Sequence, residues 1–106
     1  MIITIPWQSA ADFQFEMSLD RHVYLLRARW NDYSKAWGLD IFSRAKSPLI
    51  LGIKLTRGSD ALQGMNSPEH PPGALMVMGA EEPTYTSFFT GDSVLVYIPI
   101  EDIRAL

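Results

Sequence analysis

Residues 23–56 constrain the fold more than any other stretch, because three apolar runs alternate there with two short polar loops. The runs are seven or eight residues long, and the loops are five or six residues long. Loops of this length connect antiparallel strands, whereas a crossover between parallel strands needs about a dozen residues or more. The stretch therefore predicts a three-stranded antiparallel meander.

Four further segments have strand character: residues 1–5, 13–19, 74–78 and 94–100. Within the second of these segments apolar and polar side chains alternate without a break, which is typical of a half-buried strand. Gly38 is expected to mark a bulge or a close backbone approach inside the meander. Pro99 is expected to place the end of the last strand at a sheet edge.

The strand segments and the stretch between them define the expected fold. Residues 57–64 are predicted to form one short helical turn, capped by Ser59 or Asp60 and ended by Gly64. Six or seven strands with one such turn and no internal repeat predict an all-β fold, either a small antiparallel barrel or a sandwich. We expect a single β domain over residues 1–106, with an N-terminal strand or arm at 1–12, a core at 13–100 and a tail at 101–106.

Composition excludes several classes of protein. The net charge is −3 and neither sign forms a block, so the chain lacks the basic footprint of a nucleic-acid-binding protein. The absence of cysteine removes disulfides, thiolate zinc sites and cysteine nucleophiles. No signal-peptide pattern occurs at the start, and no run approaches the roughly 20 apolar residues that span a bilayer. We expect a soluble chain with no membrane partner.

No arrangement of residues typical of catalysis or metal binding is present. His22 and His70 lie in predicted loops without metal-ligand spacing, and no nucleophile elbow or phosphate-binding loop occurs. We therefore expect no enzyme, no cofactor and no metal. Asp40 is better explained as a cross-strand partner for Arg27 or Arg29.

Several predicted strands are apolar on both faces, which is unusual for a small antiparallel protein. No long helix is predicted that could cover the second face. The surplus apolar surface must then be enclosed in a barrel or be covered by another protein. The candidate partner-contact residues are Val23, Leu25, Phe42, Ile50, Met76, Met78 and Tyr97.

Four sequence blocks in a fixed order resemble a known family. They are FQFEMSLD at residues 13–20, LRARWN followed by WGLDIF at 26–42, PL, GIKL and GSDAL at 48–62, and the carboxy-terminal pattern of GALMV, PTY and VLVY at 73–97. In this order and spacing the chain resembles the small baseplate plug proteins of contractile-tailed phages and related tail-like elements. The resemblance covers roughly residues 13–100.

The resemblance implies a non-enzymatic component of the phage virion, made in the host cytoplasm and built into the tail baseplate. The implied partners are the central hub, spike or tube-initiation proteins, together with further copies of the chain. It implies no catalytic residues. The alternative from another class is a nucleic-acid- or carbohydrate-binding β-barrel that uses Arg27, Arg29 and nearby aromatic rings.

Overall fold

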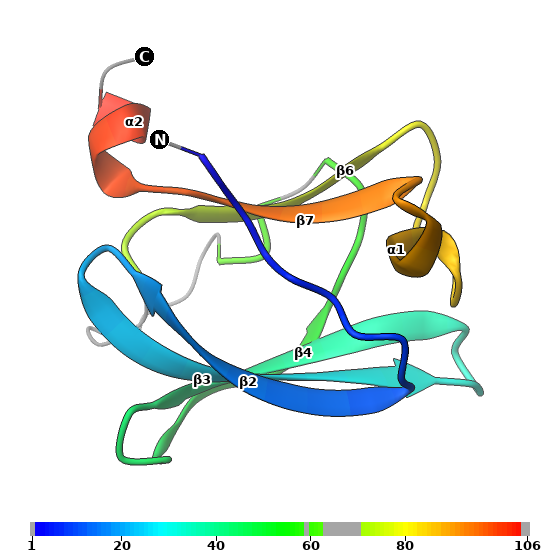
Figure 1. The fold of residues 1–106 in the computed structure, drawn as a ribbon, viewed down its shortest axis with the longest axis horizontal. Coiled ribbons are helices and arrows are strands. Elements are labelled where there is room, and N and C mark those ends of the chain that lie inside the picture. The colour runs from blue at the N-terminus through cyan, green and yellow to red at the C-terminus, as the bar shows by residue number, and fades with distance from the viewer. Residues whose placement is uncertain (1, 59, 63–70, 105–106) are drawn as a thin grey trace.

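The computed structural model describes residues 2–58, 60–62 and 71–104, and it consists of seven strands and two short helices (Figure 1). All strand pairs are antiparallel and form two sheets. The elements are β1 (Ile3–Thr4), β2 (Asp12–Leu19), β3 (His22–Asn31), β4 (Ala36–Ser43), β5 (Pro48–Lys54), β6 (Ala74–Gly79), α1 (Ser87–Thr90), β7 (Ser93–Ile98) and α2 (Ile100–Arg104).

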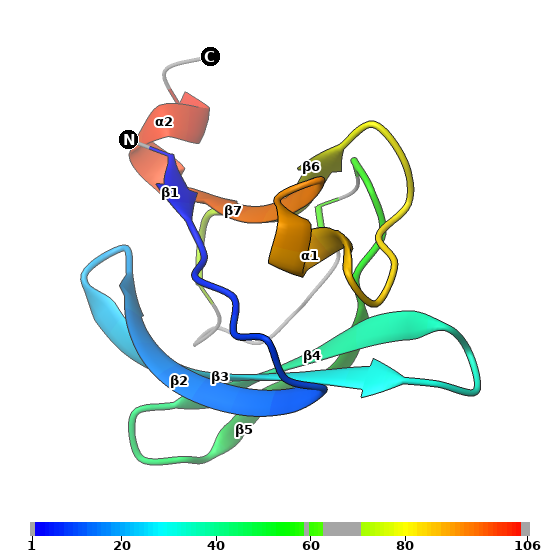
Figure 2. The same cartoon turned by 45° about the vertical axis from the view of Figure 1, so that its right-hand side comes forward.

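The two sheets pack face to face as a sandwich. One sheet has the strand order β2-β3-β4-β5, and the other has the order β1-β7-β6. The first sheet contains the predicted meander, extended by β2 at its edge. Figures 1 and 2 show the three-stranded sheet above the four-stranded one, with the connector from β1 to β2 descending between them. Of the two predicted all-β architectures, the sandwich is therefore confirmed, and the sheets do not close into a barrel.

The predicted helical turn at residues 57–64 is wrong for the part that the structure describes. There the backbone N–H of Gly58 donates to Val77 O at 2.9 Å, and that of Ala61 donates to Leu75 O at 2.7 Å. The described residues of this segment, 57, 58 and 60–62, are named here the strap; they lie along the outer edge of β6, with a bridge from Arg57 to Val77 and a turn at residues 61–62. Ser59 and Gly64 lie outside the described residues. The helical turns occur later, at α1 and α2.

Two local predictions for glycine and proline are also wrong. Gly38 pairs regularly with Arg29 and Lys54, and a Cβ added there would make only ordinary contacts. The irregular strand is β5 instead: its register with β4 shifts between Leu39 and Ile41, where the bulge lies, and again between Ile41 and Phe42. Pro99 follows β7, but β7 is the middle strand of its sheet rather than an edge.

The core lies between the inward faces of the two sheets. Alternating positions of β2, β3 and β4 point inward, as the period of a strand requires. Tyr97 and Leu95 of β7 and Leu75 and Val77 of β6 complete the core from the opposite sheet. At one end of the sandwich Trp37 is fully buried, and its indole N–H donates to Thr84 O at 3.2 Å. This bond ties β4 to the segment that leads into α1.

A polar link joins the two sheets at the β2–β3 turn. The Tyr97 hydroxyl donates to Asp20 Oδ2 at 2.5 Å and accepts the backbone N–H of Gly73 at 2.7 Å. The same Asp20 oxygen accepts the backbone N–H of Ile100 at 3.1 Å. Burial raises the pKa of Tyr97, and its hydrogen bond to Asp20 raises that pKa further. The phenol therefore remains protonated at neutral pH and serves as the donor.

Backbone geometry at both ends of this link is restrictive. Asp20 has φ 51° and Arg21 has φ 70°, the left-handed conformation of both central residues in a two-residue hairpin turn. A Cβ on Gly73 would lie 2.1 Å from the carbonyl oxygen of Ile98 and 2.6 Å from the Tyr97 hydroxyl. Only glycine allows the backbone N–H at this position to approach the hydroxyl.

Replacing Tyr97 with Phe tests the link. The change leaves the Gly73 N–H without its acceptor and removes one donor from Asp20, so we expect a loss of about 1–3 kcal/mol in the free energy of unfolding. Urea denaturation measures it, and Tyr33→Phe is the matched control because Tyr33 is 99% exposed. An unchanged midpoint for Tyr97→Phe would show that the hydroxyl does not stabilise the sandwich.

Candidate partner-contact surface

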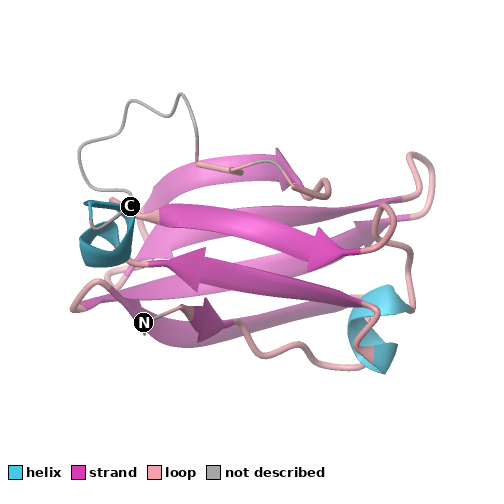
Figure 3. Cartoon of the chain, turned by 90° about the horizontal axis from the view of Figure 1, so that it is seen from above, coloured by secondary structure: helices cyan, strands magenta, loops and turns pink. Residues whose placement is uncertain are grey.

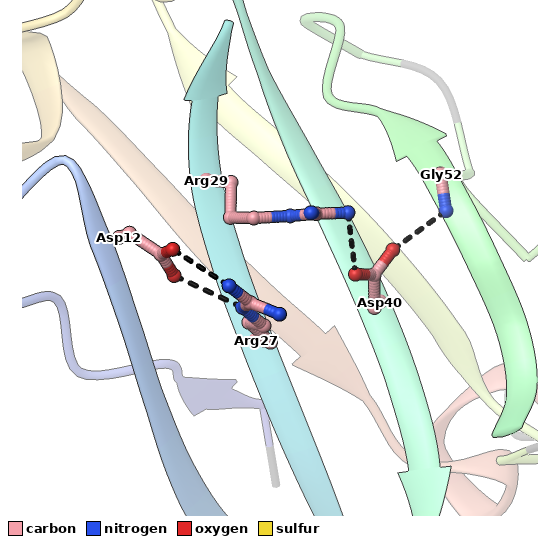
Figure 4. A network of polar contacts seen from close by, with 5 residues as sticks. All are labelled: Asp12, Arg27, Arg29, Asp40 and Gly52. Atoms are coloured by element: carbon pink, nitrogen blue, oxygen red, sulfur yellow. Dashed lines mark hydrogen bonds and ion pairs between the residues drawn. The ribbon is translucent and has the colours of Figure 1, made fainter.

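The outer face of the four-stranded sheet carries two charge pairs near the start of β2 (Figure 4). Arg27 donates to both carboxylate oxygens of Asp12, at 3.0 and 2.7 Å. Arg29 donates to Asp40 Oδ2 at 2.9 Å, which confirms the predicted cross-strand partner of Asp40. The hydrogen bond from Arg27 lowers the pKa of Asp12 and raises that of Arg27. Both arginines are therefore neutralised by a carboxylate of their own sheet.

Asp40 also fixes the irregular backbone of β5. Its side chain is 5% exposed, and Oδ1 accepts the backbone N–H of Gly52 at 2.7 Å. Gly52 has φ 73°, a conformation that glycine adopts without strain. The carboxylate thus holds the bulge of β5 with one oxygen and Arg29 with the other. The bulge in turn decides which side chains of β5 face outward.

The predicted nucleic-acid or carbohydrate site is not assembled on this face. Trp37 and Phe13 are buried in the core, so these rings are not presented next to the arginines. A groove of about 510 Å³ runs beside Arg29, Trp30 and Lys54. The Arg29 charge in this groove is paired with Asp40. A platform for stacking nucleic-acid bases needs exposed rings along a groove of net positive charge, and the described residues of this groove do not combine the two.

Farther along the same outer face the side chains become apolar. Leu25 of β3 lies directly opposite Phe42 of β4, and both are half-buried. Val23 precedes them on the same face of β3. Leu51, in the bulged part of β5, is 60% exposed. These four residues are named here the lower apolar group.

The outer face of the three-stranded sheet is more uniformly apolar. The outward side chains of β6 and β7 face each other in three cross-strand pairs: Ala74 with Ile98, Met76 with Val96, and Met78 with Val94. All six are at least partly exposed, and Met78 is 51% exposed. Figure 3 looks onto this face, with α1 and α2 at its two ends and no described helix or strand over the strands. These six residues are named here the upper apolar face.

The structure divides the predicted contact residues into two sets. Three of them lie in the lower apolar group, namely Val23, Leu25 and Phe42, and two lie on the upper apolar face, namely Met76 and Met78. That these five residues contact a partner remains a prediction. Ile50 and Tyr97 are wrong as surface residues, because they are 7% and 0% exposed and belong to the core. Ile50 pairs with the buried Ile41. Because the bulge lies between Ile50 and Ile53, the side chain of Ile50 points toward the core and not outward as expected.

Sequence reasoning also missed residues that the structure places on these faces. Val94, Val96 and Ile98 alternate with the inward Ser93, Leu95 and Tyr97. Their alternation was hidden because nearly every residue of this strand is apolar. The composition of β7 therefore does not show which of its side chains point outward. That is known only from the pairing of β7 with β6.

Neither a metal site nor a membrane span is found in the part of the chain that the structure describes. No group of three or more His, Asp or Glu side chains there could hold a metal ion. No helix among the same residues is long and apolar enough to cross a membrane.

The fold and its surfaces define a small all-β protein in which Arg27 and Arg29 are paired with aspartates of the same sheet and the outer face of β6 and β7 is apolar. Residues 2–101 match the model of the family described as cyanophage baseplate Pam3 plug gp18. The chain belongs to this family of phage baseplate plugs, which confirms the resemblance found in the sequence. It is a structural component of the tail baseplate of the virion. No curated protein matches the chain.

Truncating Asp40 tests the structural role of its carboxylate. In Asp40→Ala the N–H of Gly52 and the guanidinium of Arg29 lose a nearly buried acceptor, so we expect a loss of about 2–3 kcal/mol in the free energy of unfolding. Asp12→Ala is the matched control, because its exposed pair with Arg27 should contribute little. Chemical denaturation of both variants gives the two free energies of unfolding, and equal losses would show that the Asp40 carboxylate stabilises the fold no more than an exposed ion pair does.

Proposed function

We propose that the chain is a non-enzymatic plug held at the centre of the baseplate by hub or tube-initiation proteins, and that the upper apolar face is its main contact. The observation that carries the proposal is that all six outward side chains of β6 and β7 are apolar. The outward face of an antiparallel sheet is normally polar when it faces water. A protein of this family is part of the baseplate, an assembly in which a partner protein can cover such a face.

The size of the face supports contact on more than one side. Two paired strands of six residues, at about 3.3 Å per residue and about 4.8 Å between strands, cover a footprint of roughly 200 Å². A stable interface of ordinary size buries about 800 Å² on each partner. The upper apolar face is therefore too small alone. The lower apolar group, on the opposite side of the sandwich, offers a second contact, as expected for a plug enclosed by its partners.

The charge balance of the chain fits contacts of this kind. Arg27, Arg29 and Lys35 each form an ion pair with an aspartate of the same chain. Binding that depended on these cations would first have to break those pairs. Burial of apolar surface needs no such rearrangement and contributes about 25 cal/mol for each Å² removed from water.

Placing a charge on the upper apolar face tests the proposal. Met78→Glu should leave the fold intact, because Met78 is 51% exposed. It should weaken binding to the purified hub or tube-initiation protein of the same phage by at least about tenfold, since the carboxylate would be desolvated in the contact. Biolayer interferometry gives the dissociation constants, and Tyr33→Glu at the tip of the β3–β4 hairpin is the control.

Two outcomes of this experiment have different meanings. If the parent chain binds no hub or tube protein, the proposed partners are wrong. If it binds and Met78→Glu binds equally well, the partners stand and the upper apolar face is not the contact. Leu25→Glu, measured beside it, reports on the lower apolar group.

A further inference from the structure

The two sheets have four edge strands: β1, β2, β5 and β6. Among the described residues, β2 is the edge strand that has a regular register and no other segment paired along its outer side. The edge of β6 is covered by the strap, whose described residues are 57, 58 and 60–62. The edge strand β5 begins with Pro48 and is bulged, and β1 has only two residues. Strand β2 runs for eight residues with no shift in its register to β3. A long regular edge of this kind is a template for pairing with another strand.

The hydrogen bonds to β3 show which backbone groups of β2 point outward. The N–H of Trp30 donates to Ala11 O at 2.8 Å, so positions 11 and 30 form a hydrogen-bonded pair. Alternation then directs the N–H and C=O of residues 13, 15, 17 and 19 toward β3. The same groups of Asp12, Gln14, Glu16 and Ser18 point away from the sheet.

The side chains along this edge are suited to a second strand. On the inner side Phe15 and Met17 are only half-buried, although both pack against the core. On the outer side Gln14, Glu16 and Ser18 are exposed. A strand added here would cover Phe15 and Met17 and extend the core beyond the edge of the four-stranded sheet.

We propose that the added strand is β2 of a second copy of this chain, antiparallel and centred on Phe15. Two-fold symmetry then joins the four-stranded sheets of both copies into one continuous sheet. This inference rests on the backbone of β2 and does not depend on the proposed hub contact, which uses other faces.

Charge and pairing select one register. When Phe15 faces Phe15 of the second copy, Gln14 pairs with Glu16 and Asp12 pairs with Ser18, so every outward residue of both strands is hydrogen-bonded. Shifting the centre to Gln14 leaves Ser18 unpaired and sets Asp12 opposite Glu16. Shifting it to Glu16 leaves Asp12 unpaired and sets two Glu16 side chains opposite each other. Like charges directly opposite are destabilising, whereas the Gln14 amide can donate to a Glu16 carboxylate.

The two half-buried Phe15 rings also meet in the selected register. Residue 15 occupies a non-hydrogen-bonded pair, where opposing Cα atoms are about 4.5 Å apart and side chains are closest. Phe13, whose ring centroid is 5.9 Å from that of Phe15, lies opposite Met17 of the second copy. The contact therefore has an apolar centre on its inner side.

Cysteine pairing tests the register, because the parent chain has no cysteine. In the proposed dimer residues 14 and 16 of opposite copies have Cα atoms about 5.5 Å apart, within the range that a disulfide spans. We expect a mixture of Gln14→Cys and Glu16→Cys chains to form the mixed disulfide dimer on oxidation, as measured by intact mass. Each variant alone should form at least about tenfold less disulfide dimer. Tyr33→Cys, at an exposed hairpin, reports random collision.

Proline substitution tests the edge without cysteine chemistry. Gln14→Pro removes an outward N–H and leaves the β2–β3 ladder intact, so it should raise the dimer dissociation constant at least about tenfold. Lys54→Pro places the same change on the outward side of β5 and should leave the constant unchanged. Native mass spectrometry gives both constants, and circular dichroism checks the fold.

A parent chain that is monomeric at high micromolar concentration would overturn the inference. Disulfides in the single-variant samples equal to those in the mixture would also overturn it. If Gln14→Pro fails to fold, the cysteine mixture still decides the outcome.

Discussion

The hydrogen-bonded link from Asp20 through Tyr97 to Gly73 is the interaction on which the arrangement of the sandwich depends. It joins the β2–β3 turn of one sheet to β7 and to the start of β6 in the other. Tyr97 places an apolar ring in the core and a hydroxyl between two polar partners, so the two sheets meet in one alignment rather than sliding over each other. With this alignment fixed, the outward faces of β6 and β7 are fixed as well.

The parts of the fold that could be predicted from the sequence are those set by local contacts. The alternation from Phe13 to Leu19 located β2, and the polar loop after Trp30 located a turn in which Asn31 Oδ1 accepts the N–H groups of Tyr33 and Ser34. An ion pair of Asp40 with Arg27 or Arg29 followed from the hairpin pattern, and the structure shows Arg29 as the partner. Each of these features depends on residues close together in the chain.

The features that could not be predicted depend on distant partners. Ile50 points toward the core because the bulge held by Asp40 and Gly52 adds a residue to β5 between Ile50 and the inward Ile53. Tyr97 faces the core because its hydroxyl is bonded to a turn nearly eighty positions earlier in the chain. In strands that are apolar on both sides, the sequence period carries no information about facing. The sequence thus predicts that apolar strand residues are exposed, but it identifies only some of the residues that form this surface.

In the proposed function the upper apolar face becomes buried when the plug enters the baseplate. Methionine oxidation measures this most directly, because Met76 and Met78 lie on that face and Met78 is 51% exposed. Intact baseplates and the free chain would be treated with the same oxidant and compared by peptide mass spectrometry. We predict that Met78 is oxidised rapidly in the free chain and is protected in the baseplate. Equal oxidation of Met78 in both samples would show that this face stays exposed in the baseplate.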